Sequence, residues 1–342
     1  MNVVQVGLGN FGRNWYTEVL QDSPDVRVVS LVEPFADALG LLRQEVDLGD
    51  MPVFSDLETA LDALSRRGLV PEAAVVTASL PAHVPVATAA IEAGLHVLVE
   101  KPLAATVAEA RGLVELAARN RRILMVSQNY RFFPAPRYAR RLVEDGQYGE
   151  LGDIEVDFRR NLSWSFELSN PLIVDVAIHH LDLMRMLCGS DAKRVRCATW
   201  NPSYSKFRHP PCAALEVEMA TGGSVAYRGS LCSRHEATPW GGTWHLGLAE
   251  AGVTFSSFYD RAGERDELVI RNLNGEVSKI DLGSVDLNKT GERRGSLAEF
   301  VRCVRDGEEP ETSGARNIGS IALMHAALRA SQTGGWVEVE QA

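Results

Sequence analysis

Three residues of this sequence have the types and the spacing that proton transfer needs. Asp175, His179 and Asp182 follow a D-x-x-x-H-x-x-D pattern, and residues four and seven apart on a helix share one face. An imidazole titrates near neutral pH, and a carboxylate one turn away orients it and supports its charged form. The alternative is a capping or core role for His179 or for its neighbour His180. The spacing also fits a metal site, but a third convincing ligand is lacking, so we expect no metal.

A second candidate for chemistry is the lysine of Glu100-Lys101-Pro102. The apolar run His96–Val99 precedes it and predicts a buried strand, which Pro102 ends. If that strand belongs to a parallel sheet, Lys101 lies at its carboxyl end, where open α/β sheets bind their ligands. The alternative is a solvated surface lysine.

The N-terminal segment carries the pattern of a dinucleotide-binding turn. Gly7, Gly9 and Gly12 have G-x-G-x-x-G spacing, after an apolar run and before a helical pattern. The first glycine allows the tight turn, the second lets a pyrophosphate approach the backbone, and the third lets helix and strand pack closely. The N–H groups and the dipole at the helix N-terminus would face the phosphates.

An acid at the expected distance strengthens this interpretation. Glu33 closes the second apolar run, Val26–Val32, about twenty residues beyond the turn, where a carboxylate hydrogen-bonds the adenosine ribose. A tight turn without a ligand, which is the alternative, does not explain this acid. A carboxylate repels the 2′-phosphate of NADP, and the nearest basic residue downstream is Arg43. The sequence therefore predicts NAD as the cofactor, with NADP less favoured.

Size, charge and cysteine content limit the class of protein. The chain has 342 residues, enough for two domains, and 45% of them are hydrophobic and 23% charged, as in ordinary globular proteins. The formal net charge of −10 argues against binding to nucleic acid or to an anionic membrane. The five cysteines are scattered without C-x-x-C spacing, which indicates reduced thiols in a cytoplasmic protein. We expect neither a secretory signal nor a membrane span.

The first part of the chain alternates strand and helix patterns. Strands are expected at Val3–Val6, Val26–Val32, Ala73–Val76, His96–Val99 and Ile123–Val126. Helices between them include Asp56–Arg66 and Thr106–Asn120, and the second opens with a capping box, Thr106-x-x-Glu109. This alternation predicts an α/β fold whose N-terminal domain, residues 1–126, is a Rossmann domain with a parallel, doubly wound sheet.

Residues 127–342 follow a different pattern. Strand-like runs lie close together with turn residues between them, which predicts a second α/β domain with a large, mostly antiparallel sheet. The runs are Ile154–Arg160, Val195–Trp200, Ala214–Met219, Ser224–Ser233, Trp244–Leu248, Val253–Tyr259, Leu268–Asn272 and Trp336–Val339. Helices are expected near Val174–Cys188, Leu297–Asp306 and Ala315–Ser331, with a polar loop at Ser284–Gly295. Helices on one face would leave apolar surface exposed on the other, so we expect a homodimer or homotetramer through this sheet.

The chain resembles the glucose–fructose oxidoreductase/inositol dehydrogenase (Gfo/Idh/MocA) family over essentially its whole length. The resemblance rests on Gly7-Leu8-Gly9-Asn10-Phe11-Gly12, Glu100-Lys101-Pro102, Asn129-Tyr130-Arg131-Phe132, the Asp175/His179/Asp182 pattern and Ala327-x-x-x-Ser331-x-x-Gly334. It implies NAD(P)-dependent oxidation or reduction of a sugar, inositol or related polyol. By the same resemblance, Lys101 would hydrogen-bond the reacting hydroxyl, Asp175 would orient the substrate and His179 would act as the acid/base.

Pattern and resemblance together imply a set of cofactor contacts. The segment Thr77–His83 matches the family loop that lies along the cofactor, although its usual paired prolines are missing. The expected cofactor-binding residues are Gly7, Gly9, Asn10, Phe11, Gly12, Glu33, Thr77, Ser79, His83, Glu100, Lys101 and Arg131. In the family, a glycine-rich segment precedes the Asp/His helix, and a glycine follows its aspartate by two residues. In this sequence the preceding segment is Asn170–Val174, and alanine, Ala177, replaces that glycine. We therefore expect a reshaped substrate pocket.

The second domain must supply the contacts to the substrate. Aromatic and polar side chains on a sheet face suit a sugar ring, with stacking below and hydrogen bonds at the edges. The candidates are Asn161, Trp164, Arg234, His235, Trp240 and His245. The leading hypothesis is reversible hydride transfer between NAD and the carbinol carbon of the substrate. The alternatives are an NAD-dependent glycosidase that oxidises its sugar transiently and a non-catalytic sugar or nucleotide sensor.

Overall fold

The computed structural model describes residues 1–162, 170–259, 265–285 and 292–341. The chain divides into two compact units, which we call unit 1 (residues 1–128 and 293–318) and unit 2 (residues 129–292 and 319–342). Unit 1 thus includes 293–318, a segment that the sequence pattern groups with the second domain. Hydrogen bonds between residues far apart in sequence join this segment to β6. Val126 N–H donates to the Thr312 carbonyl at 2.9 Å, and the Thr312 hydroxyl donates to the Val126 carbonyl at 2.7 Å.

Unit 1 contains a six-stranded sheet of order β3-β2-β1-β4-β5-β6, and every neighbouring pair in it is parallel. The strands are β1 Asn2–Val6, β2 Arg27–Val32, β3 Val53–Phe54, β4 Ala73–Val76, β5 His96–Val99 and β6 Leu124–Val126. The predicted Rossmann fold is confirmed. The sequence pattern omits β3 because a two-residue strand carries no periodicity.

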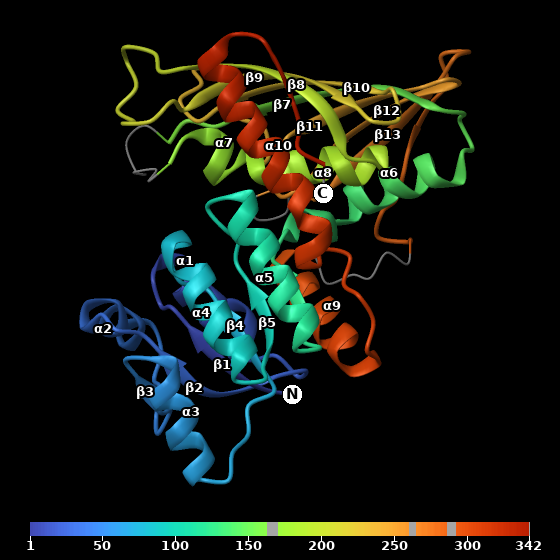
Figure 1. Ribbon diagram of the computed structural model, residues 1–342. Coiled ribbons are helices and arrows are strands. Elements are labelled where there is room, and N and C mark those ends of the chain that lie inside the picture. The colour runs from blue at the N-terminus through green and yellow to red at the C-terminus, as the bar shows by residue number, and fades with distance from the viewer. Residues whose placement is uncertain (163–169, 260–264, 286–291, 342) are drawn as a thin grey trace. The chain divides into compact units, whose positions relative to one another are not determined.

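The helices of unit 1 follow the strands as expected. They are α1 Asn10–Trp15, the π-helical turn η1 Tyr16–Leu20, α2 Ala36–Glu45, α3 Leu57–Arg66, α4 Leu80–Glu92, α5 Val107–Arg119 and, later in the chain, α9 Glu292–Asp306, which lies in unit 1 from residue 293 on. In Figure 1, α4 and α5 lie side by side against one face of the sheet. The N-cap at Thr106 is confirmed, because the Thr106 hydroxyl accepts a hydrogen bond from Glu109 N–H at 3.2 Å.

Unit 2 contains a nine-stranded sheet of order β14-β13-β12-β11-β7-β10-β9-β8-β15. The strands are β7 Leu151–Arg159, β8 Ala192–Trp200, β9 Cys212–Met219, β10 Ser224–Ser230, β11 Thr243–Leu248, β12 Ala251–Ser256, β13 Glu267–Asn272, β14 Val277–Lys279 and β15 Trp336–Glu338. Only β7 and β10 pair in parallel among these strands, so the predicted large, mostly antiparallel sheet is confirmed.

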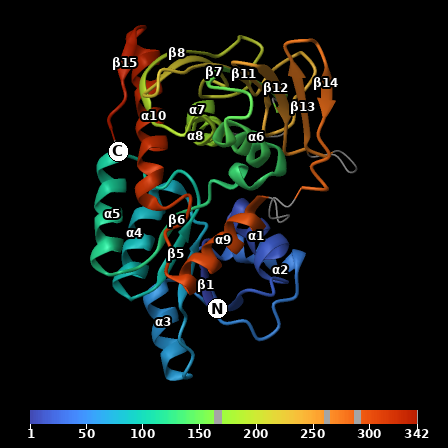
Figure 2. The same cartoon turned by 90° about the vertical axis from the view of Figure 1, so that its right-hand side faces the viewer.

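The remaining helices are the 3₁₀ turn η2 Asn129–Phe132, α6 Pro134–Asp145, α7 Leu172–Asp175, α8 Ala177–Cys188 and α10 Gly314–Thr333. Figure 2 shows α6, α7 and α8 on the same face of the nine-stranded sheet. The polar stretch Ser284–Gly295 is not all loop, because α9 already begins at Glu292, and residues 286–291 lie outside the described part. None of the helices in the described ranges is both long and apolar enough to cross a membrane.

The face of the nine-stranded sheet opposite α6, α7 and α8, which we call the open face, is polar. Exposed side chains alternate with buried ones along β7 and β10, and on β8 and β9 the outward positions form ion pairs. Arg194 pairs with Glu218 at 2.6 Å, and Arg196 pairs with Glu216. The expectation of a largely apolar exposed face is therefore wrong, because period-two alternation places charged residues at these positions.

Candidate active site

The glycine turn of unit 1 has two glycines that the chain itself requires and one that it does not. Gly7 has φ +96°, and a Cβ there would lie 2.4 Å from the Ala78 nitrogen. A Cβ on Gly12 would lie 2.1 Å from the Gly7 carbonyl oxygen. A Cβ on Gly9 would meet nothing within 4 Å, and Gly9 is exposed. The turn is thus open at the one position where the pyrophosphate of NAD needs to approach the backbone, so these residues fit the cofactor.

Glu33 lies against this turn. Its Oε2 accepts a hydrogen bond from Leu8 N–H at 2.6 Å, and its Oε1 accepts one from Phe35 N–H at 2.9 Å. Two backbone donors hold the carboxylate in place, and each oxygen keeps a further lone pair for a ribose hydroxyl. Asn10 and Phe11, at the start of α1, are exposed beside it.

Two buried polar side chains, Gln5 and Thr77, hold the glycine turn in place through hydrogen bonds. The Thr77 hydroxyl donates to the Gly7 carbonyl at 2.7 Å, and the Gln5 amide donates to the Gly12 carbonyl at 2.7 Å and to Thr77 Oγ1 at 3.1 Å. Thr77, expected to contact the cofactor, therefore has its hydroxyl engaged by the turn. Sequence reasoning missed Gln5, whose only signal is a glutamine inside an otherwise apolar strand.

Lys101 lies beside the glycine turn. Its ammonium is 5.8 Å from the centre of the Phe11 ring, and a cis peptide bond joins it to Pro102. Glu100 holds the backbone at this point, because its carboxylate accepts from Trp15 Nε1 at 2.7 Å and from Lys101 N–H at 3.1 Å. The structure thus brings Lys101, Glu100 and the turn together within unit 1.

His83 is part of the same support. Its Nδ1 is 2.8 Å from the Pro102 carbonyl oxygen and its Nε2 is 3.0 Å from that of Ala78. Burial lowers the pKa of His83 despite both contacts, and the neutral ring has one N–H to donate. His83 therefore links the Lys101 segment to the start of α4. Ser79, another expected cofactor contact, is exposed at the N-terminus of this helix.

The Asp175–His179 segment differs from the expected continuous helix. α7 ends at Asp175 and α8 begins at Ala177, with Val176 at φ −119° and ψ −48° between them. The predicted single helix over Val174–Cys188 is therefore wrong at this point. The Asp175 carboxylate turns back to the incoming chain, where it accepts from Asn170 N–H at 3.3 Å and from Asn170 Nδ2 at 3.1 Å. These local hydrogen bonds compete with a continuous helix.

The imidazole of His179 is held by an aromatic stack. Its ring is parallel to that of Tyr130, with centroids 4.1 Å apart and an interplanar angle of 5°. His179 is 6% exposed and Tyr130 is 5% exposed. Burial raises the pKa of Tyr130 well above its usual value, so a neutral phenol fixes the plane of the imidazole.

His180 has the core role that was the alternative for this pair. Its Nε2 is 3.1 Å from the Trp240 carbonyl oxygen, which can only accept, so we assign the proton to Nε2. Its Nδ1 then accepts from the Tyr227 hydroxyl at 3.2 Å. Complete burial lowers the pKa of His180 to about 4, and the ring is neutral at physiological pH.

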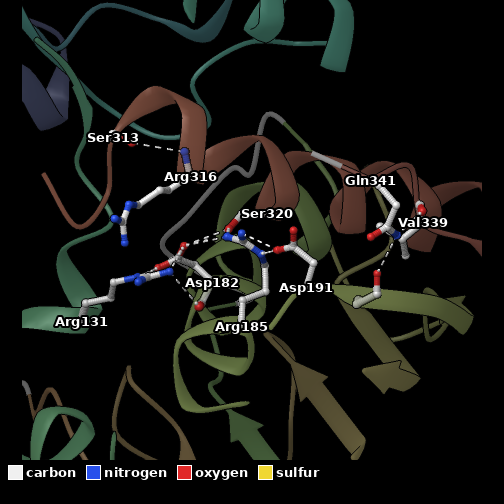
Figure 3. A network of polar contacts seen from close by, with 10 residues as sticks. Arg131, Asp182, Arg185, Asp191, Ser313, Arg316, Ser320, Val339 and Gln341 are labelled. Carbon is white, nitrogen blue, oxygen red and sulfur yellow. Dashed lines mark hydrogen bonds and ion pairs between the residues drawn. The ribbon is translucent and has the colours of Figure 1, made fainter. Parts of the chain in front are cut away.

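Asp182 belongs to a buried ion-pair network (Figure 3). It accepts from both Nε and Nη2 of Arg131, the second at 2.9 Å, and from the Ser320 hydroxyl at 2.8 Å. Arg185 donates to Ser320 at 2.8 Å and to Asp191 at 2.7 Å. Arg131, an expected cofactor contact, is therefore engaged by Asp182, and sequence reasoning missed Ser320 and Arg185 because they carry no motif.

The predicted substrate residues do not form one cluster. Arg234 and His235 line a pocket of about 420 Å³, whereas Trp240 lies beneath the Arg160 guanidinium and binds His180 through its carbonyl. Asn161 forms an isolated antiparallel β-bridge with Cys232, and Trp164 lies outside the described residues. His245 is exposed on the open face, where it contacts Thr254, because alternation along β11 places it opposite the buried Trp244. Across the described ranges, no three His, Cys, Asp or Glu side chains gather as metal ligands.

Two family models match the chain. Residues 1–128 match the model described as "Oxidoreductase family, NAD-binding Rossmann fold", and residues 137–240 match the "GFO/IDH/MocA C-terminal domain".

Known proteins resemble the chain over nearly its whole length. The D-apiose dehydrogenase of Paraburkholderia graminis is 24% identical, over 98% of this chain and 88% of that protein. The inositol 2-dehydrogenase 1 of Saccharopolyspora erythraea is 27% identical, over 98% of this chain and 96% of that protein. The crystal structure of an oxidoreductase from Agrobacterium radiobacter in complex with NAD+, L-tartaric acid and magnesium has a TM-score of 0.82 at 19% identity, covering 99% of this chain and 98% of that one. This likeness shows the fold. With its NAD-binding Rossmann unit and both family models matched, the chain belongs to the Gfo/Idh/MocA family of oxidoreductases, which act on CH–OH groups.

Proposed function

We propose that this protein transfers a hydride between NAD and a hydroxyl or keto carbon of a sugar, inositol or related polyol. The observation that carries the proposal is the ammonium of Lys101, 5.8 Å from the ring of Phe11 on the glycine turn. Relatives named D-apiose dehydrogenase and inositol 2-dehydrogenase support the substrate class. The family membership supports the reaction type.

The proposed chemistry divides between three side chains. Bound NAD supplies the hydride acceptor. His179 takes the proton of the substrate hydroxyl, and the Tyr130 stack keeps the imidazole in one plane while it does so. Lys101 stabilises the negative charge that develops on the hydroxyl oxygen, an electrostatic contribution that is large where water is excluded. Asp175, held by Asn170, orients the substrate.

Steady-state kinetics of Lys101→Ala test this assignment. The substrate is first identified by a screen for NADH formation against inositols, aldoses and nucleotide sugars. Loss of one stabilising donor lowers kcat by roughly 10²–10³. The exposed lysine of the Lys279–Glu267 ion pair gives a matched control, Lys279→Ala, which keeps wild-type turnover. Wild-type kcat in Lys101→Ala contradicts the proposal.

The same screen separates the two alternatives. An NAD-dependent glycosidase cleaves a glycoside without net NADH production. A sensor binds NAD and shows no turnover across the panel. Preference for NADP in the screen contradicts the role of Glu33, because its carboxylate is expected to repel the 2′-phosphate.

We also propose that copies of the chain associate as a homodimer or homotetramer through the open face. Trp336 on β15 is 39% exposed there, and its ring lies under the Arg194 and Arg196 guanidiniums at 4.7 and 5.7 Å. Tryptophan and arginine are typical of interface centres. The expected mass in solution is two or four times 37.4 kDa. A monomer at micromolar concentration in a sedimentation experiment contradicts this assembly.

A further inference from the structure

A carboxylate of unit 2 joins two segments that lie far apart in sequence. Asp266, just before β13, accepts a hydrogen bond on Oδ2 from Ala135 N–H at 2.9 Å. Its Oδ1 accepts one from the N–H of Phe258, which lies two residues beyond the end of β12, at 3.1 Å. Ala135 is 131 residues away from Asp266 in sequence. One side chain thus fixes the backbone of two separate segments of this unit.

The first of these segments is the start of α6. The helix opens with Pro134, which has no N–H, so Ala135 supplies its first free donor. The residue at the N-cap position, Phe133, has no polar side chain that could cap the helix. The Asp266 carboxylate takes the place of a local cap, and its charge suits the positive end of the helix dipole. The position of Phe133, beside the bound turn, therefore depends on Asp266.

The second segment has an unfavourable backbone conformation. Phe258 has φ +60°, in the left-handed region that a bulky side chain rarely adopts. Such a conformation costs about 1–3 kcal/mol and persists only where the surrounding structure determines it. The Phe258 N–H is bound by Asp266, and its carbonyl accepts from Trp240 N–H at 2.9 Å. The Asp266 carboxylate thus helps to hold the Phe258 backbone in this conformation.

Both segments present an aromatic ring to Tyr130. The Phe133 and Phe258 rings stack with centroids 4.9 Å apart, and each meets Tyr130 edge to face, at 6.3 and 5.3 Å. We call these three rings the aromatic cluster. The imidazole of His179 lies parallel to Tyr130 at 4.1 Å, on a ring that the other two orient. A displacement of Phe133 or Phe258 would therefore tilt the plane in which His179 is held.

We propose that Asp266 is a positioning residue for His179, on which it acts through the aromatic cluster. The inference rests on the proposed function, in which His179 takes the proton of the substrate hydroxyl. A carboxylate suits this role because its two oxygens accept from both N–H donors at once. Burial raises the pKa of Asp266 to about 6, so the carboxylate is charged at pH 8, where the experiments are set.

NMR spectroscopy of the full chain with carbon-13-labelled histidine tests the proposal. The ring current of Tyr130 shifts the imidazole Cε1–H resonance of His179, which is assigned by its loss in His179→Asn. Asp266→Asn keeps the size of the side chain but offers one oxygen to the two N–H donors, and its NH2 group faces the other donor. We expect the His179 resonance to move toward the position of an exposed histidine. The resonances of His83 and His245, one in each unit, stay in place and report that both units are folded.

Steady-state kinetics give a second readout, with a substrate found in the NADH screen. Asp266→Asn is expected to lower kcat roughly 10-fold and to change KM less than about twofold, because a misplaced base slows the chemical step without weakening ground-state binding. The matched control is Asp281→Asn. Asp281 accepts from Gly283 N–H at 3.1 Å in an exposed turn of the same unit. This control leaves the His179 resonance and the kinetics unchanged.

Phe258→Leu keeps the proposal testable if Asp266→Asn does not fold. It removes the ring that meets Tyr130 but keeps the N–H that Asp266 binds, so the His179 resonance is expected to move in the same direction. The proposal is overturned if this resonance stays in place in either folded variant, or if the Asp281→Asn control moves it as far.

Failure of the proposed function is a separate outcome. Wild-type turnover in His179→Asn overturns the role of His179 as the acid/base. The resonance of His179 in Asp266→Asn still shows, without any turnover, whether the carboxylate positions the imidazole. An unmoved resonance together with lost turnover in His179→Asn overturns the role of Asp266 alone.

Discussion

The glycine turn and the α7–α8 segment hold their functional groups in place by different means. In the turn, Gly7 and Gly12 are required by backbone atoms a few ångströms away, and each meets the chain at less than 2.5 Å if a Cβ is added. In α8, the side chains of His179, His180 and Asp182 depend on partners far away in sequence. Asp182 is held by Arg131 and Ser320, which are 51 and 138 residues distant.

This difference explains why one region follows its motif closely and the other does not. A turn motif specifies backbone geometry, and steric exclusion makes the glycines necessary wherever that geometry occurs. A titratable side chain acquires its role from the groups packed around it. His179 and His180 are adjacent and identical in type, yet one is stacked on Tyr130 and the other is fixed between Tyr227 and Trp240.

The largest effect is expected from Asp182→Asn, which weakens the long-range contacts of Asp182 with Arg131 and Ser320. The substitution keeps the shape of the side chain but removes the negative charge beside the Arg131 guanidinium, which is 11% exposed. Loss of one partner of a buried ion pair costs about 4 kcal/mol, measured as the free energy of unfolding in urea.

The matched control for this variant is Asp145→Asn. Asp145 pairs with Arg141 at 3.4 Å on the surface of α6, where both side chains are more than half exposed. An exposed pair of this kind contributes less than about 0.5 kcal/mol. Equal losses in the two variants would contradict the distinction between the buried network and the surface pair.

Gly7→Ala and Gly9→Ala form a pair that tests the steric requirement for glycine in the turn. Gly7→Ala places a Cβ 2.4 Å from the Ala78 backbone at a positive φ, so we expect a loss of about 3 kcal/mol in the free energy of unfolding. Gly9→Ala meets no atom of the chain within 4 Å and leaves this free energy nearly unchanged.

The same pair separates folding from cofactor binding. Gly9→Ala is expected to weaken NAD, because its methyl group would occupy the space through which the pyrophosphate approaches the turn. Fluorescence titration with NAD measures this loss. Wild-type affinity in Gly9→Ala would place the pyrophosphate elsewhere.

The parts of this protein that the sequence predicts are those set by local patterns. The five strands expected in the first domain all appear in the parallel sheet, because buried β-branched runs have few other solutions. The N-cap at Thr106 is likewise a contact between near neighbours. The glycine turn, Glu33 and Lys101 occupy the positions that their motifs predict.

What sequence reasoning missed depends on contacts between distant segments. Residues 293–318 join unit 1 through pairing of Thr312 with Val126, which no local signal shows. The break at Val176 is a local exception, because Asp175 binds Asn170 only five residues away, and a helical spacing alone does not reveal that competition. The polar open face shows that counting apolar residues in strands does not tell which face they occupy.

A smaller effect, of about 2 kcal/mol in the free energy of unfolding, is expected when the pH is lowered, because His180 is neutral in the fold. Its pKa in the fold is about 4, below the unfolded value of 6.5, so the unfolded chain binds more protons between these values. The contribution of His180 to stability is therefore complete above pH 6.5 and is lost as the pH falls toward 4. Between pH 7 and pH 5 this loss amounts to about 2 kcal/mol.

His180→Gln isolates this contribution. A glutamine amide can donate to the Trp240 carbonyl and accept from the Tyr227 hydroxyl, but it does not titrate in this range. Urea unfolding at pH 7 and pH 5 is compared between the two proteins, in which the other histidines, including His83, are the same. An identical pH dependence in both would show that His180 is not the group responsible.

The smallest effect is expected at Glu33, where the turn meets the cofactor. Glu33→Gln keeps the size of the side chain, but its single amide oxygen accepts from only one of the Leu8 and Phe35 N–H groups and its NH2 group faces the other. It removes the charge that is expected to repel a 2′-phosphate, an interaction of about 1 kcal/mol near the surface, so the kcat/KM ratio of NADP to NAD rises about fivefold. The exposed Glu58 at the start of α3 supplies the control Glu58→Gln, in which the ratio is unchanged. A ratio unaffected by Glu33→Gln would mean that the backbone donors, and not the carboxylate charge, set the cofactor preference. The glycine turn would then select its cofactor by geometry alone.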